Sequence, residues 1–332
     1  MAKVRLADIA KVAGVSAVTV HNAITGQKGV SDEMRARILE IAKEMGYRQP
    51  GSGARNTQGK SLRCIGVVIP ERYLAEYTTF YWKMYQEMAL AATEKSCMVT
   101  VEILKQEMED EMIVPCIAKE QTVDALILMG DTSRDYIHYL KKNVDLPIVF
   151  LDFYDNELAK DAVIADNFHG MYLMTEYLYE HGLTKLAFVG SIHFSSSIMD
   201  RYCGFSKAVL EHRDVTPADG SGDVMSGARI EIHLPEQMPE AFVCNCDLTA
   251  GLLMLELEKR GISVPEDVSV VGFDNYLYPG FPDLKITSYE INTKAMVKVA
   301  LEKALKQIRG AASGKNMEIV SGQLVPKESV KL

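Results

Sequence analysis

The chain has 332 residues, more than one ordinary hydrophobic core requires, and its 48% hydrophobic and 24% charged content is that of a globular protein. No apolar run is long enough to span a membrane, and the N-terminus MAKVRLADIAKVAG lacks the apolar core of a signal peptide, so we expect neither a membrane protein nor an exported one. The six cysteines are scattered without a CxxC pair, which fits a reducing cytoplasm and supports neither a disulfide framework nor a metal site.

The net charge of −9 is distributed unevenly. Residues 1–62 hold ten Lys/Arg and five Asp/Glu, whereas the remainder holds 26 and 40. A basic N-terminal segment joined to an acidic remainder is expected if only the first part meets a polyanion such as DNA. Charge alone does not distinguish this reading from an ordinary solvated helix face.

Three short helices are predicted at the N-terminus. The first covers Leu6–Ala13, and Gly14 permits a tight turn after it. Ser16 caps a second helix that runs to about Ile24, and Ser31 begins a third. A helix, a short turn with glycine and a capped helix form the arrangement that inserts a helix into the major groove of DNA. The predicted core of this unit consists of Ile9, Ala10, Ala13, Val15, Val20, Ile24, Ile38, Leu39, Ile41 and Ala42.

The residues of this segment are more specific than its shape. The string DIAKVAGVSAVTVHNAITGQKGVSDEMRARILEIAKEMGYR strongly resembles, without a gap, the headpiece of the lactose repressor and galactose repressor family. The resemblance implies that the start of the second helix reads base edges and that flanking side chains contact phosphates. The implied base readers are Ala17, Val18, His21 and Asn22. The implied phosphate contacts are Ser16, Thr19, Ser31 and Tyr47.

The implied base readers predict an unusual operator. Many family members have an arginine where Asn22 stands, and asparagine prefers adenine where arginine prefers guanine. Ala17 and Val18 offer only methyl groups, which suit the C5-methyl group of thymine. We therefore expect a half-site that is richer in A·T at these positions than the usual family core.

Residues 49–61 are polar and contain several glycines, so we expect a linker between a headpiece at 1–48 and a body at 62–332. The linker ends in Gly59-Lys60-Ser61, which resembles the end of a phosphate-binding P-loop. The first glycine of that motif is one position out of place, and an apolar strand follows where a helix is required. We therefore do not expect an NTPase.

In the resembling family the linker forms a hinge helix on DNA, and a leucine wedges into the minor groove. The family's Ala-Arg pair is present as Ala54-Arg55, but Asn56 or Thr57 occupies the leucine position. Arg55 and Asn56 are therefore candidate DNA contacts. Either the hinge helix forms weakly here, or the DNA is kinked less than in typical members.

From Cys64 onward, short apolar strands alternate with amphipathic helices, which predicts parallel sheets covered on both faces. The predicted strands are Cys64–Ile69, Val99–Leu104, Ala125–Met129, Ile148–Leu151, Leu186–Val189, Ala241–Cys244 and Val268–Phe273. The predicted helices are Phe80–Lys95, Glu107–Lys119, Arg134–Asn143, Gly170–His181, Arg201–His212, Thr249–Arg260 and Thr293–Ile308.

Two such sets in sequence imply two doubly wound lobes with a ligand site at their strand ends. We expect lobe one at about 62–163 with a returning segment near 290–325, lobe two at about 164–290, and a crossover at Val163–Ala165. The predicted fold is thus a small all-α helix-turn-helix headpiece followed by an α/β body of two doubly wound parallel-sheet lobes.

A nicotinamide enzyme is the main competitor for this architecture. The turn after the first strand, Pro70-Glu71-Arg72-Tyr73, lacks the GxGxxG fingerprint, and neither GxSxG nor HExxH occurs in the chain. The seven histidines are dispersed. We therefore expect no enzyme activity, no cofactor and no metal.

The body also resembles the lactose and galactose repressor family, most clearly in VPEDVSVVGFDN at 264–275 and DRYCGF at 200–205. Sensory lobes in that family look like periplasmic sugar-binding proteins. The resemblance therefore implies a DNA-binding regulator that responds to a small molecule. The alternative is a cytosolic or periplasmic-type sugar-binding protein without a regulatory role.

The resemblance implies three polar effector ligands: Asp152, Arg201 and Asp274. Two carboxylates and a guanidinium suit bidentate hydrogen bonds to neighbouring hydroxyls of a sugar. In the alternative reading, Asp274 caps a turn and Arg201 pairs with Asp200. The family's ligand-binding asparagine is replaced by Cys246, with Asp247 beside it. Aromatic side chains that follow strands suit stacking on a sugar face or a purine, and the candidates are Tyr73, Phe80, Phe153 and Tyr276.

One headpiece binds DNA weakly at physiological salt, so we expect a cytoplasmic homodimer on a palindromic double-stranded operator. The expected effector is a sugar or a sugar derivative. Repression relieved by the effector is the default expectation, and corepression and activation remain open. No membrane partner is expected.

Overall fold

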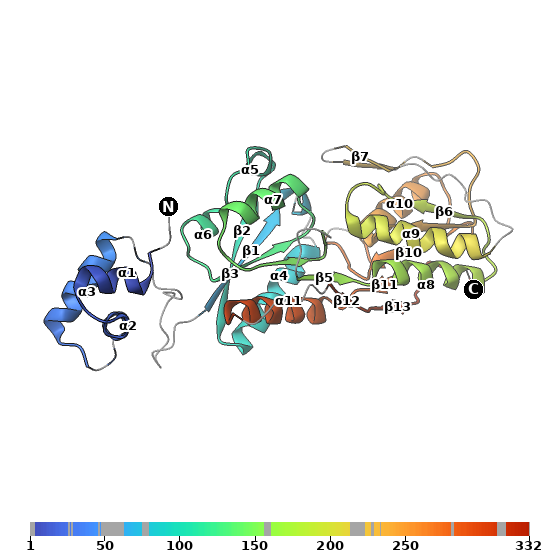
Figure 1. Cartoon of the computed structure of the whole chain (residues 1–332). Coiled ribbons are helices and arrows are strands. Elements are labelled where there is room, and N and C mark those ends of the chain that lie inside the picture. Colours follow the sequence, from blue (N-terminus) through green and yellow to red (C-terminus); the bar gives the residue numbers. More distant parts are fainter. Residues whose placement is uncertain are drawn as a thin grey trace. The chain divides into compact units, whose positions relative to one another are not determined.

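The computed structural model describes residues 4–25, 27, 29–45, 47, 63–74, 80–155, 161–212, 223–226, 229–232, 234–279, 282–310 and 317–331. The chain divides into two compact units, Met1–Arg63 and Cys64–Leu332, and each is described by itself (Figure 1). Arg55 and Asn56, with the hinge helix considered for them, lie outside the described residues.

The first unit, called the headpiece below, contains α1 (Leu6–Ala13), α2 (Ala17–Thr25) and α3 (Asp32–Glu44). Gly14 ends α1 in the left-handed conformation, with φ of 70°, which costs a glycine little. Ser16 Oγ accepts the Thr19 N–H at 3.0 Å and so caps α2. These local signals explain why the predicted helix boundaries lie close to the observed ones.

The headpiece core is small and centres on Ile9, Val20 and Ile38, each fully buried. Leu39 was predicted to belong to it but is 46% exposed. The buried positions of α3 are Ile38 and Ala42, four residues apart on one helix face, and a residue one position on points about 100° away. The prediction therefore assigned too wide a face of α3 to the core.

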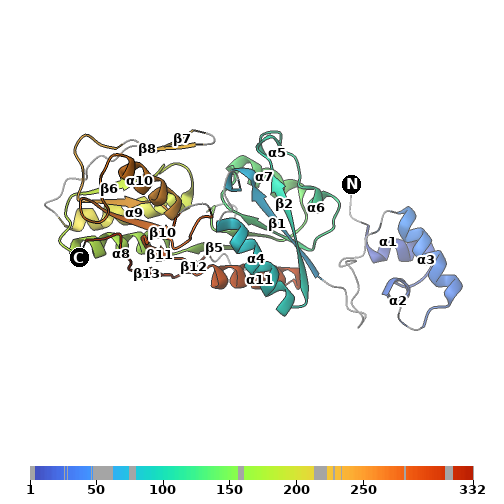
Figure 2. The ribbon, with the colours of Figure 1, turned by 180° about the vertical axis from the view of Figure 1, so that it is seen from behind.

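The first sheet of the body has the order β12-β5-β4-β3-β1-β2. Its strands are β1 (Arg63–Pro70), β2 (Cys97–Leu104), β3 (Ala125–Met129), β4 (Ile148–Leu151), β5 (Ala162–Ala165) and β12 (Glu318–Val320). The pairs of β1 with β3, β3 with β4, β4 with β5 and β5 with β12 are parallel. In Figure 2, α4 (Phe80–Glu94) and α11 (Thr293–Ile308) lie side by side on this sheet. The 3₁₀ turn η1 (Glu71–Tyr73) follows β1, and α7 (Arg134–Asn143) follows β3.

Side chains of β3 alternate between the two faces of this sheet. Ala125, Ile127 and Met129 pack in the cluster that contains α4 and α11 residues, whereas Leu126 and Leu128 pack with residues of α7. All five are fully buried. A strand buried on both faces carries a continuous apolar run, which is why the sequence predicted it.

The second sheet has the order β13-β11-β10-β9-β6. Its strands are β6 (Leu186–Val189), β9 (Ala241–Cys244), β10 (Ser269–Asp274), β11 (Thr287–Glu290) and β13 (Gln323–Val325), of which β13 is antiparallel to β11. Helices α8 (Asn167–Glu180), α9 (Ser196–Glu211) and α10 (Asp247–Lys259) accompany it. A separate hairpin is formed by β7 (Asp223–Ser226) and β8 (Arg229–Ile232).

The structure departs from the predicted elements in several places, of which two bear on the lobes. The single helix expected at Glu107–Lys119 is divided into α5 (Gln106–Asp110) and α6 (Cys116–Lys119), because Met112 has a φ of 56° and Pro115 precedes the second helix. The returning segment near 290–325 was expected to join lobe one. Only α11 and β12 do so, since β13 belongs to the second sheet.

No helix within the described part of the chain combines the length and apolar character that a membrane span requires.

Candidate functional site

The start of α2 presents the implied base readers on one face. Ala17, Val18 and His21 are exposed, and Asn22 is half-buried. Positions 17, 18, 21 and 22 share one side of a helix because four residues make about one turn. Val18 is 68% exposed, although its side chain is apolar. An exposed apolar side chain beside polar ones at a helix start is suited to the thymine methyl groups of a major groove.

The implied phosphate contacts lie at helix ends. Ser16 and Thr19 are at the start of α2, where their hydroxyl oxygens are 2.9 Å apart, and Ser31 Oγ caps α3 through the Met34 N–H at 3.3 Å. Helix N-termini carry free N–H groups that bind anions. Tyr47 packs against the headpiece core, and burial raises the pKa of its phenol.

Arg35 holds the recognition helix in place, a role that the sequence did not reveal. Its guanidinium donates to the carbonyl oxygens of Asn22 at 3.1 Å, Ala23 at 2.8 Å and Gln27 at 2.7 Å. The C-terminal end of α2 is thereby fixed to α3. The sequence included Arg35 in the family string, but only the fold shows which carbonyl groups it reaches.

In the body, polar side chains from both lobes meet at the strand ends and form what we call the strand-end cluster. Its members are Asp131 after β3, Asp152 after β4, Arg201 in α9, Asn245 after β9 and Asp274 at the end of β10. Asp152, Arg201 and Asp274 are 5%, 5% and 6% exposed. Asp152 and Asp274 also have φ of 68° and 98°, which non-glycine residues adopt at a cost that recurs at functional sites.

Arg201 is the centre of the cluster. Its Nε donates to Asn167 Oδ1 at 2.9 Å, and its Nη1 donates to the carbonyl oxygen of Asn245 at 2.7 Å. Its Nη2 lies 3.2 Å from Asp274 Oδ1, and its guanidinium stands 4.0 Å from the centre of the Phe273 ring. The guanidinium therefore makes its ion pair with Asp274, not with Asp200, whose Oδ1 faces the Tyr154 hydroxyl at 3.4 Å.

The two lobes touch at this cluster. Asp131 Oδ2 accepts the Ser196 N–H at 3.0 Å, and the Ser197 hydroxyl donates to the carbonyl oxygen of Asp152 at 2.9 Å. Both serines open α9 in the second lobe, whereas the two aspartates follow strands of the first. A ligand held here would contact both lobes at once.

Several buried polar atoms in or beside the cluster have no hydrogen-bond partner in the described structure. They include Asp152 Oδ1 and Asn245 Oδ1 of the cluster, and Asn167 Nδ2 and Ser196 Oγ beside it. A buried polar group without a partner costs about 1–3 kcal/mol, so such groups rarely gather without a ligand or water to satisfy them. Their convergence supports a binding site for a polar molecule.

Burial perturbs the acids of the cluster. Desolvation raises the pKa of Asp274 to about 7, although Arg201 opposes the shift, and Asp152 adds to it. Desolvation also raises the pKa of Asp152, again against the attraction of Arg201. The pKa of Cys246 is raised to about 11, first by burial and then by Asp274, so this side chain is a neutral thiol.

Three of the four aromatic candidates, Tyr73, Phe80 and Tyr276, pack with rings outside the core beneath α7, and Phe153 packs within that core. Tyr73 packs beside Tyr81, with ring centres 4.8 Å apart, and the Tyr81 hydroxyl donates to Asp152 Oδ2 at 2.8 Å, so this pair adjoins the cluster. Phe80 meets Tyr276 edge-on at 6.4 Å. Phe153 stacks on Phe150 at 4.8 Å in the core beneath α7, so the structure places its ring away from the other candidates.

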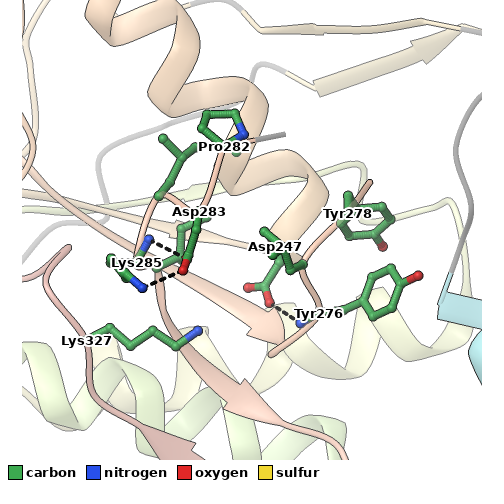
Figure 3. A pocket seen from close by; sticks show the side chains of 11 residues that line it. Asp247, Tyr276, Tyr278, Pro282, Asp283, Lys285 and Lys327 are labelled. Carbon is green, nitrogen blue, oxygen red and sulfur yellow. Dashed lines mark hydrogen bonds and ion pairs between the residues drawn. The ribbon is translucent and has the colours of Figure 1, made fainter. Parts of the chain in front are cut away.

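Asp247 has a positioning role. Its Oδ2 accepts the Tyr276 N–H at 2.8 Å (Figure 3). Its Oδ1 accepts the Ser288 hydroxyl at 2.7 Å, and burial and the nearby Asp274 raise its pKa to about 8. A side chain at Gly272 would collide with this carboxylate. The carboxylate thus fixes the loop that follows β10. Its neighbour Cys246 precedes α10, with Sγ 3.4 Å from Thr249 Oγ1.

Figure 3 also shows a pocket within the second lobe, beside that loop. Its lining consists of Asp247, Gly251, Tyr276, Leu277, Tyr278, Pro282, Asp283, Leu284, Lys285, Ile286 and Lys327. Lys285 Nζ pairs with Asp283 Oδ2 at 2.5 Å, and Lys327 Nζ donates to Asn275 Oδ1 at 2.7 Å. Its charged side chains are therefore engaged with one another and with the loop.

A helix-turn-helix unit whose second helix exposes Ala17, Val18 and His21, followed by a two-lobed body with a buried polar cluster, is the arrangement of ligand-responsive DNA-binding transcription regulators. Residues 5–49 match the family described as bacterial regulatory proteins, lacI family, and residues 175–330 match the periplasmic binding protein-like domain. The headpiece of this chain is therefore similar to the lacI family of bacterial regulatory proteins. The headpiece does not favour the alternative of a sugar-binding protein without a regulatory role.

Three known proteins illustrate the similarity. The HTH-type transcriptional repressor PurR of Aliivibrio salmonicida (strain LFI1238) is 24% identical over 330 residues, which cover 97% of this chain and 98% of that protein. A complex of the transcriptional regulator CelR with cellobiose shares the fold, with a TM-score of 0.66 at 19% identity and coverage of 98% and 100%. The lac repressor dimer bound to operator and the anti-inducer ONPF gives 0.64 at 20% identity, with 99% of each chain covered.

Proposed function

We propose that this regulator is a repressor that binds a palindromic operator as a homodimer and is released when a sugar or sugar derivative binds the strand-end cluster. The observation that carries the proposal is the convergence of Asp152, Arg201 and Asp274, from two lobes, on unpartnered buried polar atoms. Carboxylate and guanidinium groups suit the paired hydroxyls of a sugar. Because DNA is its target, the proposed site of action is the cytoplasm.

The similar proteins support parts of this proposal. One structure contains cellobiose and another contains operator DNA bound to a dimer, and the PurR relative is a repressor. A ligand that bridges two lobes changes their relative populations only through its different affinity for each arrangement. The proposed coupling therefore runs from the strand-end cluster to the spacing of the two headpieces in a dimer.

A screen for the effector tests the proposed ligand class. The unfolding temperature of the full-length protein would be measured with neutral sugars, amino sugars, sugar phosphates, nucleosides and purines. A true ligand at 100 times its dissociation constant adds about 2.7 kcal/mol to the unfolding free energy. Stabilisation by a sugar, lost in Arg201→Met, supports the proposal. Stabilisation by purines alone would contradict it.

The DNA contacts are tested separately. We propose that Ala17, Val18, His21 and Asn22 read bases and that the half-site is rich in A·T opposite them. Oligonucleotides selected from a random pool by the full-length protein should show two inverted half-sites with adenine opposite Asn22. A selected site with guanine there, or without inverted symmetry, would contradict the proposal.

A further inference from the structure

The strand-end cluster contains more carboxylates than cations among the residues that the structure describes. Asp131, Asp152 and Asp274 lie within it, and Arg201 is the cation at its centre. Buried charges in proteins are normally paired, because an isolated charge loses its hydration without compensation. An excess of carboxyl groups over cations at a ligand site therefore favours a ligand that brings a positive charge.

The cations near the cluster are already engaged. Arg201 donates to Asn167 and Asn245 and pairs with Asp274. Arg72 pairs with the buried Glu109, Nη1 to Oε2 at 2.7 Å, and its Nη2 donates to the carbonyl oxygen of Asp131. These contacts satisfy other acceptors and leave the carboxylate of Asp152 outside them.

Two lysines complete the charged surroundings. Lys327 Nζ donates to Asn275 Oδ1 at 2.7 Å, near Asp247. Lys83 Nζ lies 5.9 Å from the centre of the Tyr276 ring and attracts Asp274 at longer range. Neither makes a described hydrogen bond or ion pair with Asp152.

Asp152 is thus a buried carboxylate without a cationic partner in the described structure. Its Oδ2 accepts one hydrogen bond, from the neutral Tyr81 hydroxyl at 2.8 Å, and its Oδ1 accepts none. Arg201 attracts this carboxylate without a described hydrogen bond or ion pair to it, and Asp131 repels it more weakly. The open oxygen is therefore an acceptor for a ligand, and a positively charged donor would give Asp152 the direct ion pair that it lacks.

A group of packed aromatic rings reaches this carboxylate through the Tyr81 hydroxyl. Tyr73 lies between Tyr81, at 4.8 Å between ring centres, and Phe194 of the second lobe, at 5.8 Å and nearly perpendicular. Ring faces attract cations, and an acid beside such rings is the combination that binds ammonium groups. A neutral hydroxyl would satisfy Asp152 Oδ1 but would form neither an ion pair with it nor a cation–π contact with the rings.

We propose that the effector is a sugar that carries an ammonium group, and that Asp152, beside the Tyr73 and Tyr81 rings, pairs with that group. The inference rests on the proposed function, which makes the strand-end cluster the effector site. Arg201 and Asp274 then bind hydroxyls of the same molecule. The ligand class is thereby narrowed from sugars in general to amino sugars with a free amine.

Matched sugars test the charge directly. Binding to the full-length protein would be measured by calorimetry for D-glucosamine, D-glucose and N-acetyl-D-glucosamine, and for the corresponding galactose and mannose series, at a pH where the free amine is protonated. A hydrogen bond to a charged group is worth more than a neutral one, so at least one amino sugar should bind about tenfold more tightly than its neutral and acetylated counterparts.

A charge-removing variant assigns the preference to Asp152. In Asp152→Asn the ratio between the amino sugar and its neutral counterpart should fall to about one, whereas Asp135→Asn, an exposed change on α7, should leave it unchanged. The comparison of sugars in the unmodified protein stands even if Asp152→Asn fails to fold.

The outcomes separate the inference from the proposed function. If neutral sugars bind as tightly as amino sugars, the inference is wrong and the proposed function stands. If purines or nucleosides bind and no sugar does, both are wrong. If Asp152→Asn still binds amino sugars more tightly than neutral ones, another residue pairs with the ammonium group and the assignment to Asp152 is wrong.

Discussion

In the headpiece, the candidate base-reading side chains lie within six consecutive positions of α2. In the body, the candidate effector residues come from several strands and helices of both lobes, and Asp152, Arg201 and Asp274 are buried. The base-reading side chains of the headpiece need only α2 to form from its cap. The strand-end cluster needs two sheets to be complete before Asp152 and Arg201 come near each other. The local sequence therefore determines the surface of the headpiece, whereas the strand-end cluster depends on packing between distant segments of the body.

The largest expected loss of operator affinity follows from a change at Arg35, because this side chain of α3 donates to three carbonyl oxygens of α2 and the turn after it. Arg35→Met leaves those carbonyl groups without their charged donor and frees the recognition helix. We expect operator affinity, measured by gel retardation, to fall by about 100-fold or more, since charged hydrogen bonds are worth about 1.5–3 kcal/mol each.

A control keeps this prediction specific to the headpiece. Arg37→Met removes an exposed charge on the same helix and should cost less, while ligand-induced stabilisation of the body should be unchanged in both variants. Equal losses of operator affinity in the two variants would mean that the positive charge matters and that the hydrogen bonds of Arg35 to the carbonyl groups do not.

The next effect tests whether the two units are independent. Leu128 is fully buried between β3 and α7, so Leu128→Ala should lower the unfolding free energy of the body by about 2–5 kcal/mol. The headpiece transition, followed separately by calorimetry, should not move. A common shift of both transitions would show that the two units unfold together.

A smaller effect on operator sequence is expected from a change at Asn22 in α2. Asn22→Arg restores the residue that many family members carry at this position, and arginine prefers guanine. We expect the selected half-site to change from adenine to guanine opposite this residue, with a discrimination of about 1–3 kcal/mol. An unchanged selected sequence would mean that Asn22 does not contact a base.

The smallest effect concerns pH. The pKa of Asp274 is about 7 in the folded body against an ordinary value of 3.8, so between these values the folded protein retains a proton that the unfolded chain has lost. The contribution of this group to stability therefore falls as pH rises through that window. Asp274→Asn removes the free-energy cost of ionising this buried carboxyl group.

The measurement compares two unfolding curves. The gain in unfolding temperature of Asp274→Asn over the unmodified protein should be near zero at about pH 4 and largest above pH 7, without ligand. A gain that is constant with pH would show that Asp274 does not titrate in this range.

Much of the fold was readable from the sequence because caps and apolar runs are local. Ser16 begins α2 as predicted, and the run at β3 is buried on both faces. The short strands β12 and β13 were missed, since three residues carry no usable pattern and only their partners β5 and β11 define them. The division of the returning chain between two sheets follows from that pairing.

The candidate site was readable only in part. The resemblance implied Asp152, Arg201 and Asp274 as effector ligands, which stays a prediction, and the structure places the three side chains in one cluster. It did not foresee that Phe153 would turn into the core on Phe150, or that Asp247 would be held by Tyr276 and Ser288. Side-chain direction after a strand depends on the packing of neighbouring helices, which a local pattern does not contain.

The central claim is that ligand binding in the body changes DNA binding by the headpiece. The direct measurement is operator affinity of the full-length protein, by gel retardation, as the stabilising sugar is titrated. We expect affinity to change by about fivefold or more, with the same half-saturation as the thermal stabilisation, and we expect Arg201→Met to bind operator without responding. Operator affinity that stays constant at saturating ligand would contradict the account.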